Sequence, residues 1–145
     1  MSAEKKYDYM EHTADARFRA YGANLEEAFE NAAEAMFNVM IDTSDIPCRT
    51  SIPIEVEADD LEMLLVEWLS ELLYHFEVEF IVFSKFAVIG INHQDGVYSL
   101  SATACGEFID LDKHAFETEV KAVTYNNLLV QEAGDDTMVQ VTVDT

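Results

Sequence analysis

Hydrophobic residues recur every three or four positions in two segments of the chain, which is the spacing of an amphipathic helix. The first segment follows Asn24, a typical N-cap residue, and Glu27 three positions later completes a capping-box pattern. We therefore expect a helix that runs to about residue 40. The second segment follows Asp59 or Asp60, either of which can cap a helix. Its stripe, which we interpret as core packing, consists of Leu61, Leu64, Leu65, Trp68, Leu69, Leu72, Leu73 and Phe76.

Other segments are predicted to be strands, either because apolar and polar residues alternate or because β-branched and aromatic residues are frequent. These segments are residues 6–11, 17–21, 52–56, 81–91 (long enough for one strand or two), 97–104, 118–130 and 138–143. Pro53 favours a position near a sheet edge, and Asp95-Gly96 indicates a hairpin turn. Because helices come early and hairpins late, we expect an α+β fold. It would be a single compact domain over residues 1–145, with two helices packed on a mainly antiparallel β-sheet.

The charge of the chain restricts its partners. There are 29 acidic and 8 basic residues, so the formal net charge is -21. Such a surface repels phosphate backbones, and we expect no autonomous binding of RNA or DNA. Basic protein surfaces and divalent cations are the natural counterparts of this charge. No apolar run reaches the ~20 residues of a membrane span, and the N-terminus lacks the apolar core of a signal peptide. We therefore expect a soluble, cytoplasmic protein.

Local catalytic and cofactor motifs do not occur in the sequence. It has no GxGxxG, GxxxxGK[ST], GxSxG or HExxH pattern. Cys48 and Cys105 lie far apart and form no CxxC, so we expect two reduced thiols that pack as small apolar groups. We expect His75 and His93 to be structural or solvated.

An acidic chain is rich in oxygen ligands, which hard cations such as Ca²⁺ or Mg²⁺ prefer. The last predicted strand would deliver Asp144 and the Thr145 carboxylate to one edge of the sheet. If that strand lies beside residues 7–22, Asp15 and Asp144 converge. From the residues alone, an ordinary solvated aspartate near a chain end is the preferred explanation of Asp144.

Several motifs, in this order along the chain, resemble those of the archease family. They are EHTAD, LEEAFENAAEAMF, LLVEWLSELLYHFE, GEFIDLDKHAFETEVKAVTYNNLLV and the terminal VTVDT. Together they cover nearly the whole chain. The resemblance implies a cytosolic, non-enzymatic accessory protein of tRNA splicing. Such a protein activates the RNA-splicing ligase, promotes its guanylylation and supports multiple turnover.

The resemblance also implies a divalent-metal site for Ca²⁺, Mg²⁺ or Mn²⁺. Its ligands would be Asp15 from the EHTAD motif, and Asp144 and Thr145 from the terminal motif. His12 would be a structural group, or it would contact the ligands without binding the metal itself. Further residues match signature positions and are candidates for contact with the ligase: Lys113, His114 and Lys121.

This sequence departs from the family pattern at three positions. Thr145 stands where an apolar residue is frequent, Asn126 where a histidine is common, and Arg17 where small residues are common. None of these changes removes an oxygen ligand. Two other functions stay open: a metal-dependent hydrolase that uses Asp15 and Asp144, and a chaperone-like binding module that uses an exposed apolar sheet edge. The hydrolase lacks an accompanying nucleophile or phosphate loop.

Overall fold

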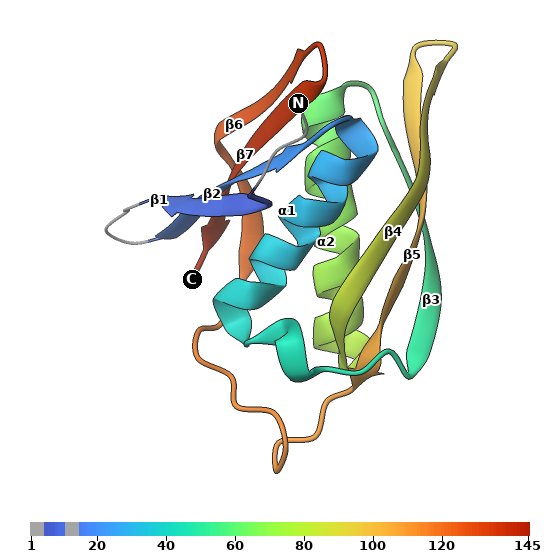
Figure 1. Ribbon diagram of the computed structural model, residues 1–145. Coiled ribbons are helices and arrows are strands. Elements are labelled where there is room, and N and C mark those ends of the chain that lie inside the picture. The colour runs from blue at the N-terminus through green and yellow to red at the C-terminus, as the bar shows by residue number, and fades with distance from the viewer. Residues whose placement is uncertain (1–4, 11–14) are drawn as a thin grey trace.

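The strands form two antiparallel sheets, and both helices lie between them (Figure 1). The computed structural model describes residues 5–10 and 15–145. One sheet has the strand order β1-β2-β7-β6 and the other β3-β5-β4. The strands are β1 (Tyr7–Met10), β2 (Asp15–Gly22), β3 (Thr50–Ala58), β4 (Ile81–Gln94), β5 (Val97–Phe108), β6 (Ala122–Ala133) and β7 (Asp136–Asp144). The predicted α+β class is confirmed, with the antiparallel strands divided between two sheets.

Both predicted helices form, and each begins at a side-chain cap. In α1 (Leu25–Met40), the Asn24 side chain accepts a hydrogen bond from the Glu27 backbone N–H at 2.8 Å. The Glu27 carboxylate accepts in turn from the Ala23 N–H at 2.7 Å. In α2 (Leu61–Glu79), the cap is Asp60. These bonds satisfy backbone donors that a helix start leaves unpaired.

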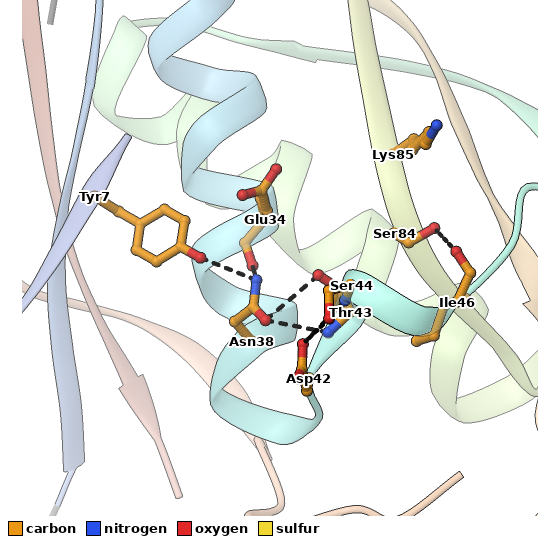
Figure 2. Close-up of a pocket in the computed structure, with 9 residues that line it drawn as sticks. All are labelled: Tyr7, Glu34, Asn38, Asp42, Thr43, Ser44, Ile46, Ser84 and Lys85. Carbon is orange, nitrogen blue, oxygen red and sulfur yellow. Dashed lines mark hydrogen bonds between the residues drawn. The ribbon is translucent and has the colours of Figure 1, made fainter. Parts of the chain in front are cut away.

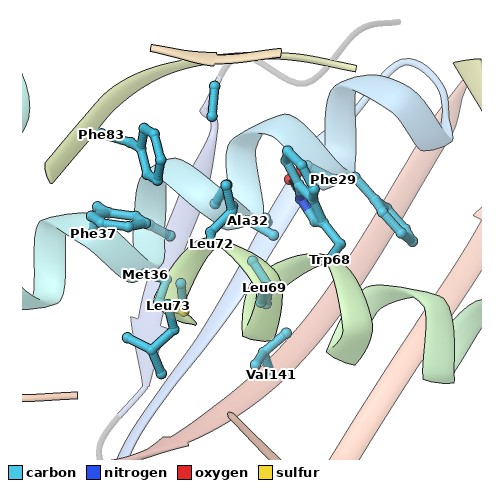
Figure 3. Packing of buried hydrophobic residues seen from close by; sticks show 14 of the residues in the cluster. Phe29, Ala32, Met36, Phe37, Trp68, Leu69, Leu72, Leu73, Phe83 and Val141 are labelled. Carbon is cyan, nitrogen blue, oxygen red and sulfur yellow. Dashed lines mark hydrogen bonds between the residues drawn. The ribbon is translucent and has the colours of Figure 1, made fainter. Parts of the chain in front are cut away.

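The stripe of α2 packs against α1 and the inner faces of the sheets (Figure 3). Trp68 is fully buried, and its indole N–H donates to the Phe29 carbonyl of α1 at 2.9 Å. The Phe37 ring lies edge-on to the Phe83 ring of β4, with 5.6 Å between the centroids. Val141 reaches the same core from β7. The helices therefore fix the position of the four-stranded sheet that carries the predicted metal ligands.

The strands differ from the prediction mainly in their limits. Residues 81–91 belong to one long strand, β4, whose pairing with β5 shifts register twice. Pro53 lies in β3 at a sheet edge, as predicted. The strand expected from residue 118 begins instead at Ala122, which pairs with Asp144. Asp144 is the last residue of β7, so the pairing stops there, and only the Lys121 N–H still reaches the Asp144 carbonyl. In the described part of the chain, neither helix is long and apolar enough to cross a membrane.

The predicted pair of reduced thiols is wrong, because Cys48 and Cys105 form a disulfide. Cys48 precedes β3, and β3 pairs with β5 so that Ser51 lies opposite Cys105. The Arg49 N–H donates to the Gly106 carbonyl at 2.8 Å, which extends this pairing towards Cys48. The two Cα atoms are 5.2 Å apart, within the usual range for a disulfide. Sequence spacing alone does not reveal a contact that strand pairing creates.

Candidate functional site

The two aspartates predicted as metal ligands occupy positions at the same end of the four-stranded sheet. β2 and β7 pair in antiparallel register, so Asp15, the first residue of β2, lies opposite Asp144, the last residue of β7. The Lys121 backbone N–H donates to the Asp144 carbonyl at 2.7 Å. Three of the predicted residues therefore meet here although they lie far apart in sequence. Thr145 follows Asp144 directly and is half-buried.

The residues at this end fit a hard divalent cation by their chemistry. The Asp144 side chain is exposed at this end of the sheet. Within residues 5–10 and 15–145, no group of three or more His, Cys, Asp or Glu residues gathers around a common point. A cation here would take aspartate oxygens and oxygens of Thr145, with water completing its shell, as Ca²⁺ and Mg²⁺ commonly do.

Two arginines follow Asp15 along β2 and have fixed orientations. Arg17 Nε donates to Thr142 Oγ1 of β7, and Arg19 Nε donates to Gln140 Oε1, both at 2.9 Å. Thr142 is fully buried, which anchors the stem of Arg17. Arg17 is one of the departures from the family pattern. It pairs with Thr142, two positions along the ladder from the Asp15–Asp144 pair. Its positive charge offsets part of the negative charge at this end of the sheet.

Lys113 and His114 gather around the buried carboxylate of Glu107, which the sequence pattern did not single out. His114 Nε2 lies 2.7 Å from one Glu107 oxygen, and Lys113 Nζ lies 2.9 Å from the same oxygen. Arg49 Nε is 3.4 Å from the other oxygen. Hydrogen bonds from Lys113, and then from His114, hold the pKa of the Glu107 carboxyl below its usual value. We call these four residues the Glu107 cluster.

The hydrogen bonds of His114 assign its tautomer. The Asp110 backbone N–H donates to His114 Nδ1 at 2.9 Å, so Nδ1 is the acceptor and Nε2 carries the proton that is donated to Glu107. Both ring nitrogens of His114 are therefore engaged in hydrogen bonds. His114 is only 6% exposed, which leaves it little surface for contact with a partner. The ring primarily secures the segment between β5 and β6.

Lys113 and Lys121 are better placed for external contact than His114. Both are exposed, and the Lys113 side chain is 47% accessible despite its ion pair with Glu107. Lys113 also lines a pocket of about 260 Å³ together with Asp42 and Asp45. His12 lies outside the described residues. The Glu107 cluster was missed in the sequence because its members come from three separated segments, although a glutamate within the apolar run of β5 was a usable signal.

A second pocket, of about 290 Å³, lies where α1 ends and is lined by none of the predicted site residues (Figure 2). The Asn38 amide donates to the Tyr7 hydroxyl at 3.1 Å. The Asn38 oxygen accepts from the Thr43 N–H at 3.2 Å and from its hydroxyl at 3.3 Å. The Glu34 carboxylate pairs with Lys6 at 3.2 Å. These polar groups satisfy one another, so we interpret the pocket as a structural corner.

Two antiparallel sheets enclose two helices, and two aspartates pair at one end of the four-stranded sheet. This arrangement defines a class of small acidic α+β proteins. Residues 7–145 match the Archease protein family (MTH1598/TM1083). The chain is 54% identical over 143 residues to the "Protein archease" of Methanosarcina acetivorans, covering 99% of this chain and 98% of that one. The chain therefore belongs to the archease family.

More distant relatives agree with this assignment. The "Protein archease" of Pyrococcus furiosus is 44% identical over 131 residues, covering 90% of this chain and 92% of that one. The solution structure of Methanobacterium thermoautotrophicum protein 1598 superposes with a TM-score of 0.85 at 42% identity, covering 96% of this chain and 98% of that one. A Thermotoga maritima crystal structure, described as an archease and possible chaperone, shares the fold with a TM-score of 0.59 at 20% identity, over 94% of each chain.

Proposed function

We propose that this protein is a non-enzymatic, metal-binding activator of the RNA-splicing ligase that acts in tRNA splicing. It would promote guanylylation of the ligase and support multiple turnover, in the cytoplasm. The observation that supports this most directly is the register of β2 and β7, which places Asp15 opposite Asp144. This pairing brings the two aspartates that the family resemblance singles out to one end of the sheet.

The roles proposed for the metal ligands and for the lysines follow from the chemistry of their side chains. Asp15, Asp144 and Thr145 would hold a divalent cation, Ca²⁺, Mg²⁺ or Mn²⁺, through oxygen atoms. Such a cation neutralises phosphate charge where a nucleotide reacts. Lys113 and Lys121, both exposed, would contact the ligase, Lys121 from a position next to Asp144. The chain itself supplies no phosphate loop, and the hydrolase alternative is not favoured.

The net charge of -21 supports docking to a basic protein surface. An RNA ligase must present positive charge near its active site in order to hold RNA. An acidic accessory protein is attracted to such a surface, which raises its association rate and makes binding sensitive to salt. The same charge disfavours direct binding of RNA by this chain.

A ligation assay tests the proposal. Purified ligase is given GTP, a divalent cation and cleaved RNA, with and without this protein, and both the guanylylated ligase and the joined RNA are measured. We expect wild type to raise both signals, and Asp15→Ala and Asp144→Ala to lose most of the stimulation. Asp136→Ala, at the opposite end of β7, is the matched control and should stimulate normally.

Other results, in this assay or in assays of this chain alone, would contradict the proposal or favour another function. If the folded Asp15→Ala and Asp144→Ala variants stimulate as well as wild type, the metal site plays no part. Absence of stimulation by wild type would sink the activator assignment altogether. Nucleotide hydrolysis by this chain alone would favour the hydrolase. Metal-independent protection of unfolded proteins from aggregation would favour the chaperone-like module.

A further inference from the structure

Four large apolar side chains are exposed where α2 ends and the segment after β5 begins. The exposed fractions are 54% for Val78, 62% for Phe80, 60% for Phe108 and 79% for Leu111. A clustered set of exposed apolar side chains is more informative than the same residues scattered over a surface. We call these four residues the Phe80 surface.

The backbone brings these four residues to one end of the molecule. The Ile109 N–H donates to the Phe80 carbonyl at 2.7 Å, and Ile81, the first residue of β4, pairs with Phe108, the last residue of β5. Leu111 lies in the turn that follows, and Val78 is in the last turn of α2. Figure 1 shows the end of α2, the start of β4 and the end of β5 at the same end of the fold.

The backbone of Phe80 is unfavourable for its residue type. It has a φ of 60° and a ψ of 43°, in the left-handed region that normally suits glycine at a helix C-terminus. A bulky residue here is a genuine outlier. Phe80 is also mostly exposed, so folding recovers little of this cost by burying its ring. A strained and exposed phenylalanine is better explained by an interaction outside the folded chain than by stability.

The charges around this surface restrict what it can bind. Glu77 and Glu79 flank Val78 at the end of α2, where Glu79 also pairs with His75, and Asp110 and Asp112 flank Leu111. Lys113 and Arg49 are nearby cations, and both already pair with Glu107. A second copy of this chain would bring another net charge of -21 to the same place. A nucleic acid would be repelled for the same reason.

We infer that the Phe80 surface docks a basic segment of a partner protein, in which an apolar side chain inserts beside Phe80 and flanking Lys or Arg residues face the four carboxylates. Aromatic side chains are frequent anchors of this kind, and the surrounding charges set the orientation and the association rate. This inference rests on the proposed function in one respect, which is that the RNA-splicing ligase is the partner to be tested. The surface is separate from Asp15 and Asp144.

The experiment combines binding with stability, because a glycine at position 80 should change the two in opposite directions. Phe80→Gly relieves the left-handed strain, and we expect Tm to hold or to rise by about 2–4 °C. Binding to purified ligase, measured by calorimetry, should weaken at least tenfold. Leu111→Ser should weaken binding by a similar factor. Ile89→Ser is the matched control, because Ile89 is 75% exposed but lies well along β4, and its affinity should equal that of wild type.

The outcomes separate this inference from the proposed function. If wild type binds the ligase and both Phe80→Gly and Leu111→Ser bind equally well, the Phe80 surface is not a docking site, although activation stands. If wild type does not bind the ligase, both proposals fail. A concentration-dependent dimer that Phe80→Gly dissolves would assign the surface to a second copy and overturn the inference. Affinity for the ligase that does not fall with added salt would also overturn it, because the flanking carboxylates would then have no role.

Discussion

Asp15 pairs with Asp144 across β2 and β7, so residues near opposite ends of the chain share one end of a sheet. The Lys121 N–H, bound to the Asp144 carbonyl at 2.7 Å, ties the start of β6 to the same place. Because β2 and β7 are neighbouring strands packed on the helices, the position of this pair depends on the whole fold rather than on a local loop.

Calcium should stabilise the protein through Asp144. At a free Ca²⁺ concentration of about 100 times the dissociation constant, linkage adds about 2.7 kcal/mol to the free energy of unfolding. Thermal unfolding of wild type should therefore shift to higher temperature as Ca²⁺ is titrated, and Asp144→Asn should shift little. Asp136→Asn, exposed at the other end of β7, should respond as wild type does. An equal shift for Asp144→Asn would place the cation elsewhere.

Removal of His114 should loosen the segment between β5 and β6. His114→Ala deprives the buried Glu107 carboxylate and the Asp110 N–H of hydrogen bonds, and unsatisfied buried polar groups cost about 1–3 kcal/mol. We expect a loss of that size in urea unfolding. His93→Ala is the control, because His93 is exposed and stacks on Tyr98 at the surface, and its effect should stay within about 0.5 kcal/mol. Equal effects of the two variants would contradict a structural role for His114.

The Glu107 cluster should make stability fall in acid. Because the pKa of Glu107 is lowered in the folded protein, its contribution is fully present above its unfolded value of 4.5 and is lost as the pH falls through the folded pKa. Wild type should therefore be more stable than Glu107→Gln at pH 7, and the difference should shrink below pH 4.5. Urea unfolding at a series of pH values measures this. A difference that does not depend on pH would mean that the carboxylate charge is not what stabilises the cluster.

Truncation of Trp68 should be among the most damaging changes in the core. Trp68→Ala removes a fully buried ring and its bond to the Phe29 carbonyl, and such substitutions cost about 3–5 kcal/mol. Circular dichroism follows the unfolding, since the sole tryptophan is lost. Tyr74→Ala, on the same helix but 52% exposed, should cost far less. Comparable losses for the two variants would contradict the packing described here.

Reduction of the Cys48–Cys105 disulfide should lower stability. The bond closes a loop with a sequence separation of 57, for which chain entropy predicts about 4 kcal/mol. A reductant should therefore lower the Tm of wild type clearly. Cys48→Ser should already have the lower Tm and should not respond to the reductant. A wild-type Tm that is insensitive to reductant would mean that the bond does not contribute to folding.

Local pattern was sufficient to predict the helices and most strands. The cap at Asn24, the stripe around Trp68 and the turn at Asp95-Gly96 depend on residues close in sequence, and the structure has all three. Periodicity cannot assign strands to sheets, because pairing depends on contacts between distant segments. For that reason the strands divide between two sheets where the pattern suggested one.

The sequence by itself determined the acidic charge, the two helices, the α+β class and, through motifs, the family. Tertiary structure decided which residues meet: Asp15 with Asp144, Cys48 with Cys105, and Glu107 with Arg49, Lys113 and His114. It also decided that Phe80 is left strained and exposed. Helix caps and hydrophobic stripes act over a few residues and can be read locally. Strand register, disulfide pairing and the ion pairs of a buried carboxylate arise only when the folded core holds distant segments together.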